Sequence, residues 1–166
     1  MKRDTAEPQS NTLARVSPSV GRVASQGFSL IELLLVVAII VLLASIAVPN
    51  LMKARRAANE ASAVSTLKLI AGGQLVYRQS QGQYTTLASL NQDSIIDNLV
   101  GSGIKSGYAF DSSPGPSPAE EYTATATPSV PSGIAASGVR YFFIMQDHVL
   151  RYNMTGPADS TSTPLN

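Results

Sequence analysis

The chain has 166 residues, no cysteine and a formal net charge of +1. A chain of this length builds about one domain with an appendage. The lack of cysteine excludes disulfide bonds, thiolate metal sites, cysteine nucleophiles and acylated lipoprotein N-termini. The near-neutral charge and the lack of a basic patch predict no nucleic-acid partner.

Residues 1–27 are polar and include Pro8, Pro18 and Gly21. They show no apolar period of the kind that builds a helix or a strand. This composition predicts a targeting segment, a leader peptide of 27 residues, rather than a folded domain.

An apolar run follows from Phe28 to Val48, and only Ser29, Glu32 and Ser45 interrupt it. As a helix, this run rises roughly 31 Å, which suffices to cross a bilayer core of about 30 Å. We therefore predict a transmembrane helix over residues 28–48.

The helical pattern continues beyond Pro49 as far as residue 80. Small and apolar residues recur there at spacings of three and four, namely Ala57, Ala61, Val64, Leu67, Ala71 and Leu75. The opposite face carries charged side chains, namely Arg55, Arg56, Glu60 and Lys68. The pattern predicts one long helix over 28–80, with a kink or loosened turn at Pro49 because proline cannot donate to the helical ladder.

Residues 81–166 are predicted to form a globular domain of loops and antiparallel strands. The segment 87–100 is compatible with a short helix, and strands are expected at 107–111 and 121–127. The segment 139–152 is long enough for one strand or for a tight hairpin turning near residues 146–148. The expected fold class is α+β, in which the second half of the long helix packs against a small antiparallel sheet of three or four strands.

Two readings of the apolar run compete. Ser45-Ile46-Ala47 satisfies the small-x-small rule for cleavage of an ordinary secretory signal. However, the run is much longer than the 7–15 residues of a secretory signal. It also contains Glu32, and a charge at the centre of a membrane helix costs about 2.5–3.5 kcal/mol. These features favour a helix that stays part of the mature chain and in which Glu32 has a function.

The stretch Gly27-Phe28-Ser29-Leu30-Ile31-Glu32, followed by the apolar run, resembles the prepilin signature of type IV pilins and type II secretion pseudopilins. The resemblance implies that a membrane peptidase cuts between Gly27 and Phe28 and that the new amine of Phe28 is methylated. It also implies assembly roles for Glu32 and Pro49. The similarity continues through the segment 49–70 and, more weakly, through the predicted strands.

The function implied by this resemblance is that of a structural pilus subunit and not of an enzyme, with no cofactor and no metal. The implied partners are other copies of the chain, the prepilin peptidase/N-methyltransferase, the inner-membrane assembly platform and membrane lipid. The subunit would cross the inner membrane once, with its C-terminal domain on the periplasmic side, and then enter a filament.

Other readings stay open. A pseudopilin of a type II secretion system has the same signature, although the scattered acidic residues form no calcium-binding loop. A membrane-anchored binding domain or enzyme would need only the anchor, but no G-x-S-x-G motif accompanies the single histidine, His148.

Two features depart from the family pattern. The leader is long for the family. Lys53, Arg55 and Arg56 follow the run, so the positive-inside rule alone would place the C-terminal side in the cytoplasm, opposite to the family orientation.

Overall fold

The computed structural model describes residues 27–165. The predicted leader peptide, apart from Gly27, lies outside the described residues. The chain divides into two compact units, one ending at Ile39 and one beginning at Ile40. The described part of the first unit contains the start of helix α1, and the second contains the rest of α1 and the whole sheet.

Helix α1 runs over Leu30–Gln81, with Pro49 in its interior. Near its start, the amide of Leu33 donates to the carbonyl of Ser29 at 3.2 Å. Its C-terminus is closed by Gly82, which has a φ of 74° and donates its amide to the carbonyl of Arg78 at 2.8 Å. Glycine adopts this left-handed conformation without strain, so Gly82 is an effective helix stop.

The sheet has six strands in the order β1-β2-β3-β4-β5-β6, and every neighbouring pair is antiparallel. Its strands are β1 (Ile104–Lys105), β2 (Tyr108–Pro114), β3 (Tyr122–Pro128), β4 (Tyr141–Met145), β5 (Arg151–Asn153) and β6 (Thr163–Pro164). Two short helices precede it, α2 (Leu87–Gln92) and α3 (Asn98–Gly101). The α+β class with an antiparallel sheet is therefore confirmed.

The segment 139–152 forms the hairpin, one of the two predicted alternatives, since β4 and β5 are separate strands paired antiparallel. Other details differ from the expectation. The region 87–100 holds α2 and most of α3 rather than one helix. The sheet also gains β1 and β6, which are two residues long each. Strands this short carry no alternating pattern, so the local sequence gave no signal for them.

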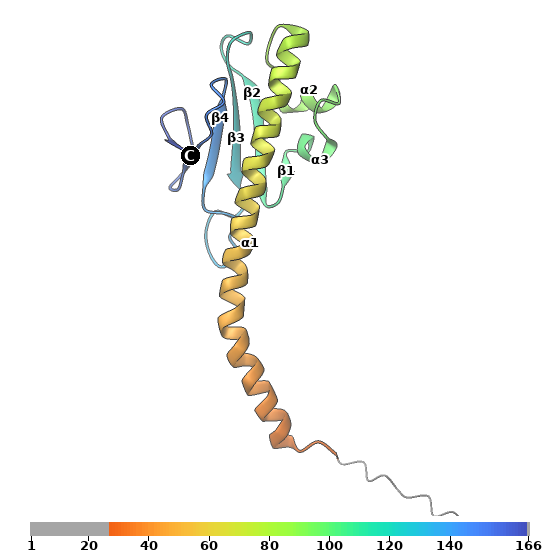
Figure 1. The fold of residues 1–166 in the computed structure, drawn as a ribbon, viewed down its shortest axis with the longest axis vertical. Helices are drawn as coiled ribbons and strands as arrows, with labels where there is room; N and C mark the ends of the chain where they lie inside the picture. Colours follow the sequence, from red (N-terminus) through yellow and green to blue (C-terminus); the bar gives the residue numbers. More distant parts are fainter. Residues whose placement is uncertain (1–26, 166) are drawn as a thin grey trace, which may run out of the picture. The chain divides into compact units, whose positions relative to one another are not determined.

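In the second unit, the core lies between α1 and one face of the sheet. Figure 1 shows the yellow-to-green part of α1 lying across the strands, with α2 and α3 beside it. Ala63, Leu67 and Ile70 of α1 are fully buried. The facing residues of β3 include Ala124 and Ala126, which are also buried. Small side chains on a central strand let the helix approach the sheet closely, so the packing is dense.

The predicted face of the helix is partly wrong. Ala57, Ala61 and Leu75 belong to the small and apolar face of the predicted pattern, but all three are exposed. Glu60 was assigned to the charged face, but it is buried. The buried face includes Glu60 and Gln74 because both side chains find hydrogen-bond partners among residues 81–166, and these bonds offset the usual cost of burying a polar group.

Candidate processing and assembly site

Gly27 and Phe28 precede the first turn of α1, and both are exposed. Phe28 retains 77% of its accessible surface. A Cβ atom built on Gly27 meets no described atom within 4 Å, so packing within residues 27–165 gives no reason for glycine at this position. Any requirement for glycine must therefore come from a partner protein that recognises this segment.

Glu32 lies in the first turn of α1 and is exposed. Its neighbours Ile31 and Leu33 are also exposed, at 74% and 59%. Among residues 27–165 the ion pairs are Glu60–Arg140 and Asp147–Arg151, so Glu32 has no cationic partner within the described chain. A carboxylate in apolar surroundings is costly unless it is paired, which makes the surroundings of Glu32 incomplete in the isolated subunit.

The first half of α1 presents an apolar surface on which no residue of the described range, 27–165, is packed. An 18-residue window of this helix has a mean hydropathy of 3.0, and none of it is buried. The core helix of a soluble protein would be mostly covered. Exposed apolar surface of this extent marks a membrane or protein contact.

Pro49 lies in the second unit and interrupts the hydrogen-bond ladder of α1 without ending the helix. Because proline has no amide hydrogen, the carbonyl of Ser45 loses its usual donor four residues on. The hydroxyl of Ser45 meanwhile donates to the carbonyl of Leu42 at 2.7 Å. This part of the helix is thus held by fewer backbone bonds than the rest.

A cluster of polar side chains on α1 binds the segment 133–140, a contact that the sequence analysis does not predict. Arg56 donates to the carbonyls of Gly133 and Ile134, at 2.7 and 3.0 Å. Asn59 donates to the carbonyl of Ser137 at 2.8 Å.

Glu60 completes this cluster. Its carboxylate accepts from the amide of Val139 at 2.9 Å and from Nε of Arg140 at 2.7 Å. The spacing of residues 56, 59 and 60 puts the three side chains on one face of a helix. This spacing is the one signal that reasoning from the sequence could have used, and it does not name the partner.

His148 is exposed, in the turn between β4 and β5, with its ring 6.4 Å from that of Tyr122. Within residues 27–165, no group of three or more His, Cys, Asp or Glu side chains could hold a metal ion.

The N-terminal segment matches a family of known proteins. Residues 22–48 match the sequence model described as the prokaryotic N-terminal methylation motif. The chain is also 39% identical, over 72 residues, to a Thermus thermophilus protein described as the type IV wide pilus major component PilA4. Part of the chain is thus similar to a type IV pilin.

The aligned region covers only part of each chain. The alignment covers 43% of this chain and 52% of PilA4, so the chain spans about half the length of the curated relative that it matches. The motif match contains Gly27, Phe28 and Glu32 and ends at Val48, just before Pro49. The motif match is confined to the N-terminal segment, and the described chain has an α+β fold.

Proposed function

We propose that this pilin relative is a structural subunit of a type IV pilus. The observation that carries the proposal is the coincidence of a methylation motif at residues 22–48 with an apolar helix surface that no described residue covers. In a subunit of this kind, the same apolar surface contacts lipid before assembly and other subunits after it. The known relative is a pilus component, so the pseudopilin alternative is not favoured.

In this proposal, a membrane peptidase removes residues 1–27 and a methylase modifies the amine of Phe28. Residues 28–48 then hold the chain in the inner membrane, with the outer domain, residues 81–166, on the periplasmic side. The exposed Gly27–Phe28 junction supports this order of events, because an enzyme can reach it without unfolding any described element. The chain itself performs no catalysis in this scheme.

Processing is tested by intact mass and N-terminal peptide mapping of the protein from its native membrane. We expect a chain that begins at Phe28 and carries one added methyl group. A terminus at Val48 would indicate an ordinary secretory signal, and a terminus at Met1 would indicate an uncleaved anchor.

Assembly is tested by electron microscopy of filaments sheared from cells, together with mass spectrometry of their subunits. We expect the processed chain within the filaments. Cells that process the chain normally but form no filaments containing it would contradict the pilus role and leave the methylation motif intact. A Gly27→Leu variant is the matched control, since it should abolish both processing and incorporation while leaving the described fold unchanged.

A further inference from the structure

Residues 129–139, which with Arg140 connect β3 to β4, include no charged side chain and expose apolar ones. Ile134 retains 82% of its accessible surface, and Val130 retains 44%. The other side chains of this segment are mostly small, and all are uncharged. Any apolar contact that buries the large, exposed side chain of Ile134 therefore lowers the free energy. We refer to residues 129–139 as the β3–β4 loop.

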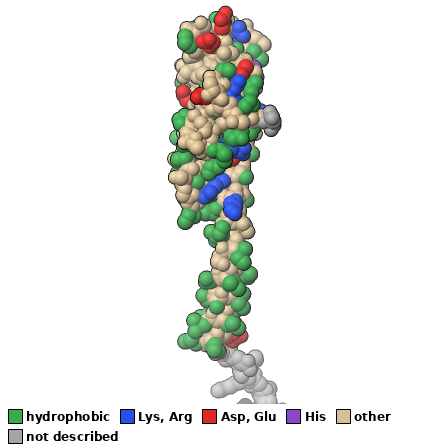
Figure 2. All heavy atoms as spheres, turned by 90° about the vertical axis from the view of Figure 1, so that its left-hand side faces the viewer, with side chains coloured by type: hydrophobic (Ala, Val, Ile, Leu, Met, Phe, Trp, Pro, Cys, Tyr) green, Lys and Arg blue, Asp and Glu red, His purple; other side chains and the backbone are tan. Residues whose placement is uncertain are grey.

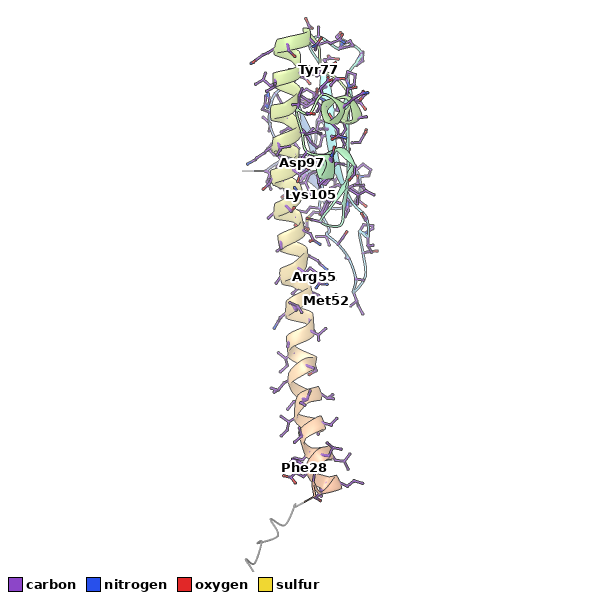
Figure 3. All side chains as sticks on the ribbon, turned by 90° about the vertical axis from the view of Figure 1, so that its right-hand side faces the viewer. Phe28, Met52, Arg55, Tyr77, Asp97 and Lys105 are labelled. Atoms are coloured by element: carbon purple, nitrogen blue, oxygen red, sulfur yellow. The ribbon has the colours of Figure 1, made fainter. Side chains whose placement is uncertain are left out.

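The β3–β4 loop is fixed against α1. Arg56 and Asn59 of α1 bind three of its backbone carbonyls, those of Gly133, Ile134 and Ser137. Figure 3 shows this loop reaching along α1 to the level of Met52 and Arg55. Ile134 is therefore held beside the helix, at the place where the apolar run gives way to basic residues.

Ile134 and α1 together line an open groove of about 630 Å³. The α1 residues that line it are Val41, Ala44, Ser45, Val48, Pro49, Met52, Lys53 and Arg56. One end of the groove is aliphatic and belongs to the predicted membrane span. The other end carries Lys53 and Arg56, so the groove extends across the predicted boundary of the bilayer.

The charges beside this groove have one sign. No acidic residue occurs between Glu32 and Glu60, while Lys53, Arg55 and Arg56 are clustered within that interval. Figure 2 shows basic side chains next to the apolar part of the helix. An aliphatic wall continued by cations complements a phospholipid, with the acyl chain against the wall and the phosphate against the cations.

We propose that the β3–β4 loop is a membrane anchor of the unassembled subunit, which inserts Ile134 into the periplasmic leaflet while Lys53 and Arg55 bind the phosphates of anionic phospholipids. The proposal rests on the proposed function, because it requires residues 28–48 to span the membrane. Arg56 is already engaged by the loop carbonyls and acts as the support that positions Ile134. The anchor would hold the outer domain against the bilayer until the subunit is extracted.

The absence of cysteine makes this proposal directly testable, because one introduced cysteine is a unique labelling site. Ala135→Cys puts a fluorophore on the exposed β3–β4 loop with Ile134 intact. Ser117→Cys is the matched control, since it is exposed in the β2–β3 connection, at the other end of β3. Leu35→Cys reports whether the helix itself is in the bilayer.

The labelled full-length chains are reconstituted in vesicles of phosphatidylethanolamine and phosphatidylglycerol, or of phosphatidylcholine alone. Quenching is compared between nitroxides attached to lipids and a water-soluble quencher. We expect the ratio of lipid to aqueous quenching to be several-fold higher at position 135 than at position 117. Ile134→Ser should bring position 135 down to the ratio of the control.

The cationic contact has its own variant. In wild type, the ratio of lipid to aqueous quenching at position 135 should be higher in the anionic vesicles than in phosphatidylcholine. Lys53→Gln combined with Arg55→Gln should reduce this preference for the anionic vesicles by about fivefold for each cation removed. Unchanged preference would overturn the phosphate contact. Circular dichroism of each variant confirms that the fold is retained, as expected for substitutions of exposed side chains.

The remaining outcomes separate the competing explanations. If position 35 is in lipid and position 135 is in water, the loop anchor is wrong and the membrane-spanning helix stands. If position 35 is itself in water, the proposed function fails first. If position 135 is protected only at a high ratio of protein to lipid, the groove binds a second copy of the chain, and the lipid proposal is overturned.

Discussion

At the scale of single residues, Glu60 joins the helix to the sheet. Its carboxylate accepts the amide of Val139 and the guanidinium of Arg140, which is also held over the rings of Phe142 and Tyr152, at 5.5 and 5.6 Å. Glu60 keeps 7% of its side-chain surface, whereas Arg140 keeps 33%. Because Arg140 is partly solvated, the pair is weaker than a fully buried one.

Glu60→Gln should lower the free energy of unfolding by about 1 kcal/mol, because the amide oxygen still accepts hydrogen bonds but the charge is lost. Glu60→Leu should cost about 3 kcal/mol, since it leaves a backbone amide and a guanidinium unpaired. Denaturant unfolding of the full chain in detergent measures both. Lys68→Gln, on the exposed face, is the control. Equal stabilities of Glu60→Leu and Lys68→Gln would show that the contact is not stabilising.

Tyr108 and Tyr122 differ in their hydrogen bonding although both are fully buried. The hydroxyl of Tyr108 donates to the carbonyl of Arg140 at 2.9 Å. The hydroxyl of Tyr122 has no hydrogen-bond partner within residues 27–165. Burial raises the pKa of both phenols well above the usual value, and the nearby Glu60 adds to the increase in the pKa of Tyr108.

These pKa shifts predict alkaline destabilisation. A folded-state pKa above the unfolded value of about 10 means that the stabilising effect is complete below pH 10 and is lost as the pH rises beyond it. Tyr108→Phe and Tyr122→Phe should each reduce this loss. At pH 7, Tyr108→Phe should cost about 1 kcal/mol for its hydrogen bond, and Tyr122→Phe should cost less. Unfolding curves between pH 7 and 11 test both, and identical pH slopes in all three proteins would contradict the assignment.

At the scale of elements, Pro49 makes part of α1 easier to stretch. The segment 41–50 lacks the backbone bond that an amide at position 49 would give to the carbonyl of Ser45. We predict that this segment is locally extended when subunits pack in a filament. Pro49→Ala should restore the missing bond and slow amide hydrogen exchange in the segment. Asn50→Ala is the control, because it changes an exposed neighbour and keeps the proline.

A filament map decides the question directly. Continuous α-helical hydrogen bonding through Ser45 in the assembled wild-type subunit would contradict the predicted extension. Pro49→Ala should still enter the membrane, since alanine is at least as well accommodated in a helix as proline.

Local patterns predicted the elements that are built from local signals. The strands β2 and β3 alternate buried and exposed residues along their length, so their sequence carries the period of a strand. The polar contacts of α1 were missed for the opposite reason. Arg56 and Glu60 bind groups that are 77 to 80 positions away in the chain. A single sequence does not tell which distant backbone satisfies a buried carboxylate.

In the candidate site, too, some features could be predicted from the sequence and others appear only in the structure. Gly27, Phe28 and Glu32 form one contiguous motif, which could be recognised without any knowledge of the fold. Their roles stay predictions. The β3–β4 loop became visible only in the structure, because its composition of small residues is that of an ordinary solvated loop. Its contact with α1 gives Ile134 a fixed position.

At the scale of the whole molecule, the proposed function requires the chain to be stable in two environments, the membrane and the filament. The exposed leucines, isoleucines and valines of the first half of α1 suit both lipid and neighbouring helices. Ala57 and Ala61 are exposed farther along the same helix. Small side chains on a helix surface let another helix approach closely, so these alanines fit a contact made only in the filament.

We propose that Glu32 is the residue that distinguishes the two environments. In the isolated chain it has no cationic partner within residues 27–165. Cleavage after Gly27 would create a positive amine on Phe28, one helical turn away in the sequence. Pairing with the amine of a neighbouring subunit would fix the axial offset between helices, a use of buried polar groups that is known from coiled coils.

Glu32→Leu should therefore leave a processed, membrane-inserted and folded protein that enters filaments poorly, because the substitution removes the charge and keeps an apolar side chain. Glu32→Asp is the matched control, since it keeps the charge and should retain part of the assembly. Filament yield from sheared cells, membrane content and the mass of the N-terminal peptide are measured for both variants. Loss of Phe28 methylation in Glu32→Leu would assign the residue to recognition by the methylase, whereas normal methylation with poor filament yield supports the pairing. A normal filament yield from Glu32→Leu would refute both roles, since neither could then be needed for assembly.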